Sequence, residues 1–354
     1  LLYATMRADG SSKFTLDPWG YFPSVGAGWV ISQEPFMENN SVFDFLKLRA
    51  SWGKLGNDNV SASAGSNTIQ VIQAALDDQP AEGVVSTNVF SNNTWEVIEE
   101  MNFGLNAVFF DNQLSLDADY YIRDTENAIL PVFVPIVNLF VDTNAGVIRN
   151  QGLELNLNWT KQVSDDFNYT IGANFTTLKN KATQLPDPGY IDGGTPEFRQ
   201  RPQLGGPLFA FYGYETTGVY QNQAQIEADP AVTSADVVPG DLIYKDQNGD
   251  NIIDDDDRVI IGSILPDFTF GGNVGVDYRN WGFSMNFYGQ IGNQILNRKR
   301  GEVIFTNDTN MDADLAINRW HGEGTSNTYP SSAGLRKGWN QRLSNFWVED
   351  GDFF

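Results

Sequence analysis

Apolar and polar residues alternate with a period of two along much of the chain. This is the pattern of strands whose two faces meet different surroundings. In 152–160 one face carries Leu153, Leu155, Leu157 and Trp159, and the other carries Glu154, Asn156, Asn158 and Thr160. The same alternation marks 25–32, 46–53, 101–110, 113–123, 168–176, 268–278 and 281–288. We therefore predict an all-β protein in which these segments are strands.

The connections between the predicted strands alternate between short and long. Positions 111–112 and 279–280 are typical of two-residue turns, and 162–166 of a five-residue turn. The other connections are long, and they cover 54–100, 124–151, 178–267 and 291–345. Outer-membrane barrels share this asymmetry, with short periplasmic turns and long extracellular loops. Strands of about 9–11 residues also cross a bilayer when tilted. The pattern predicts part of a large antiparallel transmembrane β-barrel, with about ten strands in this chain.

A soluble β-sandwich or lectin-like barrel would show the same alternation, with its apolar face in a core. Polar residues fill the second face of nearly every strand, which favours a water-filled lumen instead. The most apolar run, 128–141, contains Pro131 and Pro135, which we expect to break any regular strand or helix. This run either packs among the loops, extends a strand above the membrane, or contacts a partner protein.

Composition excludes several classes of protein. The 354 residues include 22 Lys and Arg, 45 Asp and Glu, one His and no Cys, for a net charge of −23. Without Cys there is no disulfide, thiolate metal site or Cys nucleophile. The negative charge argues against a nucleic-acid partner. No apolar stretch reaches the about 18 residues of a membrane helix. The chain begins with Leu1 rather than Met, so we expect it to be a piece of a longer protein.

An acidic segment at 246–257 has the oxygen spacing of an EF-hand-type calcium loop. Counted from Asp246, the predicted ligands stand at positions 1, 3, 5, 7, 9 and 12; they are Asp246, Asn248, Asp250, Ile252 through its carbonyl, Asp254 and Asp257. Asn251 replaces the usual Gly at position 6, and Asn tolerates a left-handed backbone well. Asp257 replaces Glu at position 12, which shortens its reach.

The alternative for this segment is a solvated acidic turn between Tyr244 and Val259. Its clustered carboxylates would then repel one another without a cation. We expect a structural Ca²⁺ ion that orders the long loop 178–267, because no helices flank the segment as they do in switching EF-hands. No other cofactor is predicted.

Catalytic chemistry has little support in the sequence. The many carboxylates do not fall in a recognisable glycosidase context. His321, the single His, lies in a polar Gly-rich loop and is typical of a surface residue. We predict that the protein is not an enzyme and has no catalytic residues.

An ordered set of short motifs points to a family. The motifs fall at 7–14 (R-x-D-G-S-S-K-F), 22–29 (F-P-S-x-x-x-G-W), 46–57 (L-K-L-R-x-S-x-G-x-x-G-N), 95–96 (W-E), 144–146 (N-x-G), 150–154 (N-x-G-x-E), 239–241 (P-G-D), 262–263 (G-S) and Pro266. In this order they resemble the SusC/RagA family of TonB-linked outer-membrane proteins of Bacteroidota. The likeness runs over nearly all of 1–354.

The resemblance implies a 22-stranded barrel with an N-terminal plug, of which 1–354 would be the later part. The plug, the TonB box and the first strands are absent from this chain, and the last strands are cut short. The loop 178–267 would be extracellular. The family's function would be TonB-dependent import of oligomeric nutrients across the outer membrane, of glycans first and peptides second.

The resemblance also implies partners: a SusD-like surface lipoprotein as a lid, TonB acting through a region not in this sequence, outer-membrane lipids, and a possible dimer of importer–lid pairs. It does not give substrate-binding residues. Two other functions stay open from the residues alone, a passive porin and a soluble or surface calcium-stabilised carbohydrate-binding or adhesion protein.

Overall fold

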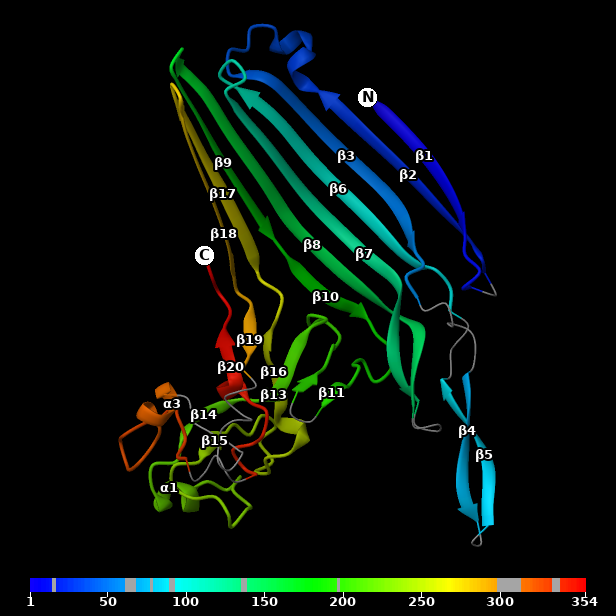
Figure 1. Cartoon of the computed structure of the whole chain (residues 1–354), viewed down its shortest axis with the longest axis vertical. Helices are drawn as coiled ribbons and strands as arrows, with labels where there is room; N and C mark the ends of the chain where they lie inside the picture. Colours follow the sequence, from blue (N-terminus) through cyan, green and yellow to red (C-terminus); the bar gives the residue numbers. More distant parts are fainter. Residues whose placement is uncertain are drawn as a thin grey trace.

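The largest part of the computed structural model is one antiparallel sheet of ten strands (Figure 1). The structure describes residues 1–14, 17–60, 68–76, 79–88, 93–134, 139–195, 198–297, 313–332 and 338–354. The neighbouring strands, in order, are β1 (Leu2–Gly10), β2 (Trp19–Val30), β3 (Phe43–Asn57), β6 (Glu96–Phe109), β7 (Leu114–Val134), β8 (Leu139–Ser164), β9 (Phe167–Thr177), β17 (Phe268–Tyr278) and β18 (Trp281–Ile291). β10 (Lys179–Gln184) continues from β9 and pairs with β8. The predicted all-β class and antiparallel strands are confirmed.

The strand register makes one face of the sheet apolar and the other polar. Side chains of successive residues point to opposite faces, so each register row belongs to one face. One row across five strands reads Leu48, Leu105, Ala118, Leu155 and Phe175. The adjacent row reads Lys47, Asn106, Asp117, Asn156 and Asn174. We call these the apolar face and the polar face.

Aromatic rings mark the apolar face at its short-turn end, at the top of Figure 1. The Phe43 and Phe109 ring centroids are 5.0 Å apart, and Phe110 stacks on Trp159 at 6.4 Å. At the loop end of the same face, Lys54 pairs with Glu99 at 2.9 Å and Arg149 with Asp124 at 2.6 Å. On β7 the apolar stretch between these two borders runs from Leu114 to Ile122. It therefore has the length of a strand that crosses the hydrocarbon core, with aromatic residues at the interface.

The turns follow the predicted alternation of short and long, with two corrections. The turn predicted at 162–166 has two residues, 165–166, because β8 runs on to Ser164 through a bulge and β9 begins at Phe167. The expected break at Pro131 was wrong, since β7 continues to Val134. Beyond Glu126, β7 pairs only with β8, and an edge strand tolerates Pro because one side needs no N–H donor. Pro135 lies outside the described residues.

The long connections carry structure of their own. The hairpin of β4 (Thr68–Leu76) and β5 (Gln79–Asn88) projects from the loop edge between β3 and β6 (Figure 1). β7 and β8 extend beyond their neighbours as a second hairpin. None of the helices in the described part of the chain is long and apolar enough to cross a membrane.

A compact assembly of loop segments lies beyond the loop ends of β17 and β18 (Figure 1). We call the described parts of 210–263 and 313–347 the loop unit. It contains β13 (Ala210–Tyr214) paired with β16 (Arg258–Ser263), β14 (Thr216–Val219) paired with β15 (Leu242–Tyr244), and the helices α1 (Gln223–Ala228) and α3 (Ala313–Asn318). β11 (Gly193–Thr195) and β12 (Phe198–Gln200) extend the β13–β16 sheet. β19 (Gln294–Leu296) and β20 (Val348–Asp350) pair beside it.

The loop unit has its own buried core. Aromatic and aliphatic side chains from both of its segments meet there, and they include Tyr214, Val219, Leu242, Tyr244, Leu315, Trp339 and Trp347. The two long loops therefore fold together, through side chains that are far apart in the sequence.

Candidate functional site

The polar face of β3, β6 and β7 holds a network centred on one guanidinium group. Arg49 Nη2 lies 2.5 Å from Asp119 Oδ2, and its other nitrogens donate to Asn102 Oδ1 and Asn106 Oδ1, each at 3.3 Å. Asn106 in turn donates to Asp117. A guanidinium group carries five N–H donors in a planar fork, so one side chain can tie three strands together. This part of the face is charged, and Arg49 pairs with one oxygen of Asp119 while the other, Oδ1, is buried without a hydrogen-bond partner among the described residues.

The polar face of β8, β9, β17 and β18 has a different composition. Asparagine, threonine, serine and glycine occupy most of its positions between Asn156 and Asn286. Thr160 and Thr170 share a hydroxyl hydrogen bond of 3.3 Å. If the sheet closes into a barrel with the apolar face against lipid, this polar surface faces the lumen.

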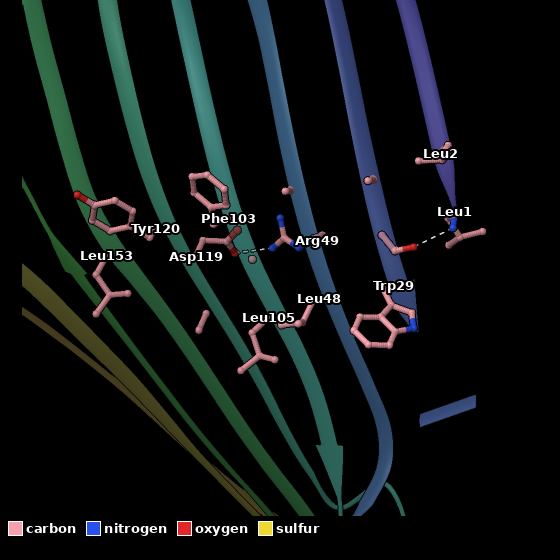
Figure 2. A pocket seen from close by; sticks show the side chains of 15 residues that line it. Leu1, Leu2, Trp29, Leu48, Arg49, Phe103, Leu105, Asp119, Tyr120 and Leu153 are labelled. Carbon is pink, nitrogen blue, oxygen red and sulfur yellow. Dashed lines mark hydrogen bonds and ion pairs between the residues drawn. The ribbon is translucent and has the colours of Figure 1, made fainter. Parts of the chain in front are cut away.

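A hollow of about 770 Å³ lies over β1, β2, β3, β6, β7 and β8, and Figure 2 shows its lining. Most of the side chains that form it belong to the apolar face, among them Trp29, Leu48, Phe103, Tyr120 and Leu153. The short side chains of Ala27, Ala50 and Ala118 leave the space between these larger groups. The hollow is therefore a depression in the surface that meets lipid, and Arg49 and Asp119 of the polar network also line it.

Residues of three predicted motifs meet at the loop end of the sheet. The rings of Phe14 and Phe22 pack against Trp95, with centroid distances of 5.1 and 5.4 Å. Ser11 Oγ donates to Asp58 Oδ2 at 3.0 Å. Phe14, Phe22 and Trp95 thus form one buried cluster at the loop end of the sheet. It packs the segment before β2 against the start of β6.

The acidic loop 246–257 is folded by its own carboxylates and amides. Asp246 accepts from the backbone N–H groups of Gly249 at 2.6 Å and Asn251 at 2.8 Å, and these bonds hold the pKa of its carboxyl below the usual value. Asn251 has φ of 64°, as predicted for position 6. Asp257 is fully buried and accepts from Gln247 N and Asp254 N, both at 2.8 Å.

The six predicted ligands thus lie in one turn, but their geometry does not test the calcium prediction. Asn248 and Asp250 bind neighbouring backbone N–H groups, at 3.0 and 2.8 Å. Asp254 caps the short 3₁₀ turn Asp255–Asp257, and Ile252 is half exposed. Within the described ranges, no three His, Cys, Asp or Glu side chains are grouped closely enough to hold a metal. The donor set is all oxygen, which is the chemistry that Ca²⁺ prefers, so calcium stays a prediction.

The acidic loop is joined to the core of the loop unit by Arg342. Its Nη1 donates to the carbonyl of Ile253 at 3.1 Å, and its guanidinium carbon lies 4.6 Å from the Trp339 ring centroid. Beside it, the buried Asn340 accepts from Leu242 N at 2.8 Å and donates to Asp241 Oδ1 at 2.9 Å. These contacts connect residues about a hundred positions apart in sequence, and they fix the two loops relative to each other.

Burial changes the titration of tyrosines in the loop unit. Burial raises the pKa of Tyr214 to about 12. The pKa of Tyr220 is also raised, first by burial and then by donation of its hydroxyl to Asp229 Oδ2 at 2.5 Å. Neutral phenols are favoured because a buried phenolate loses its hydration.

Sequence reasoning missed the residues that dominate the charged part of the polar face. Arg49 was seen only as part of a motif, and Asp119 only as a polar position in a strand. Their pairing depends on the β3–β6–β7 register, which places Arg49, Gly104 and Asp119 in one row. The glycine between them leaves room for the guanidinium group, because a Cβ there would lie 2.5 Å from Arg49 Cζ. The signal in the sequence was Gly104, a glycine at a polar position of an alternating strand, which leaves room for a large side chain from the next strand.

Comparison with known proteins gives one family. The family model described as "TonB dependent receptor-like, beta-barrel" matches residues 2–314. TonB-dependent receptor P3 of Formosa agariphila is 32% identical over 359 residues, covering 99% of this chain. TonB-dependent receptor SusC of Bacteroides thetaiotaomicron is 28% identical over 310 residues, covering 82% of this chain. The chain spans 35% of the first relative and 29% of the second.

Solved structures show the same fold. The RagAB peptide transporter superposes with a TM-score of 0.80 at 20% identity, over 99% of this chain and 37% of that one. The RagAB peptide importer in its open-open state gives a TM-score of 0.76 at 21% identity, over 99% and 37%. At these identities the likeness concerns the fold alone.

Proposed function

The chain belongs to the TonB-dependent receptor β-barrel family, and from this premise we propose that it forms the later part of an importer for oligomeric nutrients. The predicted SusC/RagA-like identity and the outer-membrane location are confirmed. The activity itself is our proposal. The observation that carries it is a sheet whose apolar face is bordered by aromatic rings and ion pairs, while its other face is mostly polar. Such a sheet separates lipid from a wet lumen.

The finer parts of the proposal are the substrate, the energy source and the partners. We take glycans as the first substrate class and peptides as the second. Energy would come through TonB, and a SusD-like surface lipoprotein would cover the barrel mouth, with a dimer of importer–lid pairs as the assembly. The relatives named above are receptors and transporters, which supports transport over catalysis. That the protein is not an enzyme stays a prediction.

Import can be tested in the bacterium that encodes the protein. Deleting the full-length gene should abolish growth on at least one oligosaccharide supplied as the sole carbon source, and restoring the gene should recover it. Collapse of the inner-membrane proton gradient should stop uptake of that sugar, because the outer membrane has no energy source of its own. Uptake that persists without the gradient would favour the passive porin. Unchanged growth on every oligosaccharide and peptide would contradict import.

Partners can be tested in the same strain. The full-length protein, extracted from outer membranes in detergent, should co-purify with a lipoprotein of the SusD type. Purification of the importer alone, under conditions that retain other outer-membrane complexes, would contradict the lid. A soluble adhesion protein would be released without detergent.

We propose further that Ca²⁺ binds the acidic loop and orders 178–267. The all-oxygen donor set and the left-handed Asn251 support this. A chelator should speed proteolysis of this loop in the full-length protein, and Asp250→Ala should do so without chelator. Glu227→Ala is the matched control, since Glu227 is an exposed acid on α1 in the same loop. Cleavage that is equal with and without chelator would remove the calcium proposal.

A further inference from the structure

Five asparagines form a band across the polar face of β8, β9, β17 and β18. One register row passes through Asn156, Asn174, Gly271 and Tyr288. The next row passes through Asn158, Gly172, Asn273 and Asn286. Because paired residues lie side by side on one face, the amides of four strands meet on one continuous surface.

The five amides are available to a ligand. All five side chains are exposed, and none makes a side-chain hydrogen bond to another residue in the described parts of the chain. The asparagines of the neighbouring strands differ, since Asn102 and Asn106 are held by Arg49. A primary amide offers two donors and an acceptor with two lone pairs. The band therefore presents both kinds of hydrogen-bonding group at a close spacing.

Two glycines set the shape of this band. A Cβ added at Gly271 would lie 3.1 Å from both amide atoms of Asn174, and one added at Gly172 would collide with the amide of Asn273. The two amides therefore lie over glycine positions, close to the plane of the sheet. A larger residue at either glycine would push the amides aside.

An aromatic ring lies next to the band. Tyr288 ends the first row and is 72% exposed. Its ring meets Phe353 edge-to-face at 5.7 Å, which fixes the ring orientation. An exposed ring face beside amides matches the chemistry of a sugar. The C–H faces of a pyranose stack on the ring, while its hydroxyls donate to and accept from the amides.

The five amides and Tyr288 carry no charge themselves, and the acids that flank them are Glu154 on the same face of β8 and Asp117, which pairs with Asn156. On β9 the polar-face positions from Thr170 to Thr176, on β17 those from Thr269 to Gly275, and on β18 those from Ser284 to Gln290 are all neutral. Arg49 and its partners lie on β3, β6 and β7, and β8 adds Glu154 beside Asp119. A neutral polymer avoids the desolvation of charged groups that a peptide with ionised termini and side chains would bring to this surface.

We propose that Asn156, Asn158, Asn174, Asn273, Asn286 and Tyr288 form a contact site for a neutral, hydroxyl-rich glycan inside the lumen. The proposal rests on the proposed import function, and it adds the surface along which the substrate moves. The site offers several similar hydrogen-bonding amides along the luminal face. A polymer can therefore exchange one sugar unit for the next without leaving the site.

The test replaces three amides in the full-length protein in its own outer membrane. Cells receive tritium-labelled neutral hexasaccharides of the gluco, galacto, manno and xylo series, together with a neutral hexapeptide. The triple variant Asn156→Ala, Asn174→Ala, Asn273→Ala should import the sugar favoured by the wild type about tenfold more slowly, because each lost hydrogen bond contributes about 0.5 kcal/mol and 1.4 kcal/mol is a tenfold change. The corresponding Gln variant should recover most of the rate.

The matched control is Thr176→Ala, Thr269→Ala, Ser284→Ala, which removes three hydroxyls from the same face of β9, β17 and β18. It should stay within twofold of the wild type. Equal loss in both triple variants, an unchanged rate in the Asn variant, or slower uptake of the peptide alone would overturn the site. Entry of a large antibiotic that the outer membrane normally excludes would also overturn it, since the asparagines would then seat a domain that closes the barrel.

Failure of the import function looks different. In that case the wild type itself takes up none of the labelled sugars, and gene deletion changes nothing. The contribution of the amide band is measured where the wild type imports a hexasaccharide. The wild-type rate is then compared with that of a variant that is equally abundant in the membrane.

Discussion

The sheet and the loop unit contain tryptophans in opposite environments. Trp281, on the apolar face of β18, is 80% exposed, whereas Trp347 of the loop unit is 2% exposed. The sheet is joined by strand pairing, and its large apolar groups need lipid to cover them. The loop unit buries its apolar groups within itself, as a soluble domain does. One chain therefore contains a part whose stability depends on the membrane and a part that carries its own core.

The largest expected effect comes from opening the core of the loop unit. Trp347→Ala should destabilise the loop unit by about 3–5 kcal/mol, the usual cost of a large aromatic lost from a core. Proteolysis of the full-length protein in detergent should then cut the loops while the strands keep their circular dichroism. Trp281→Ala, which removes an exposed ring, is the control and should leave the loops resistant. Loss of the strands as well in Trp347→Ala would show that the two parts are not separate.

A charge placed on the apolar face should have the next largest effect. Leu155→Arg should cost about 2–4 kcal/mol near the middle of the bilayer, because the charge loses its hydration. Its neighbour on β8, Asn156, points to the polar face, and Asn156→Arg should cost far less. Denaturant titration of both variants in lipid vesicles measures the difference. Equal losses would mean that the assignment of the two faces is wrong.

A smaller effect is expected from the polar contact that ties the two loops. Asn340→Ala leaves Asp241 Oδ1 and the Leu242 N–H buried without this partner, at a cost of about 1–3 kcal/mol. Amide hydrogen exchange should rise around Leu242 and stay unchanged in β8. Exchange that rises equally in both places would argue that the loop unit and the sheet open together.

The smallest effect is a dependence of the loop unit on alkaline pH. Folding raises the pKa of Tyr214 from 10 to about 12, so the folded state holds its proton more tightly than the unfolded state. This contribution to stability is complete below pH 10 and is lost as the pH rises through about 12. Tyrosinate absorbance together with loop proteolysis follows it, and Tyr214→Phe should reduce the pH dependence. A loop unit that is equally resistant at all pH values up to 12 would contradict the prediction.

The sheet could be predicted from the sequence because its signal is local. Alternation at Leu153, Leu155, Leu157 and Trp159 gives both the strand and its two faces. The position-6 asparagine of the acidic loop was also readable, since few residues other than Gly adopt its backbone conformation. Pro131 was misjudged because edge and central strands cannot be told apart without the pairing partners.

The loop unit could not be predicted in the same way. Its core residues lie in short strands and irregular turns that have no regular spacing of apolar residues. Leu242 and Trp339 are far apart in the sequence, and their contact is visible only in the folded structure. The Arg49 network and the asparagine band were hidden for a related reason. Each asparagine was visible as a polar position in its own strand, but the band exists only once four strands are in register.

The shared core of the loop unit also affects how such proteins diversify. Asn340 in one loop bonds to Asp241 and Leu242 in the other, so exchange of one loop alone removes these buried contacts from its partner. Recombination that transfers a single loop between relatives would produce a mismatched pair. The two loops are therefore expected to be inherited together, as one cassette carried on a barrel whose strands can vary independently.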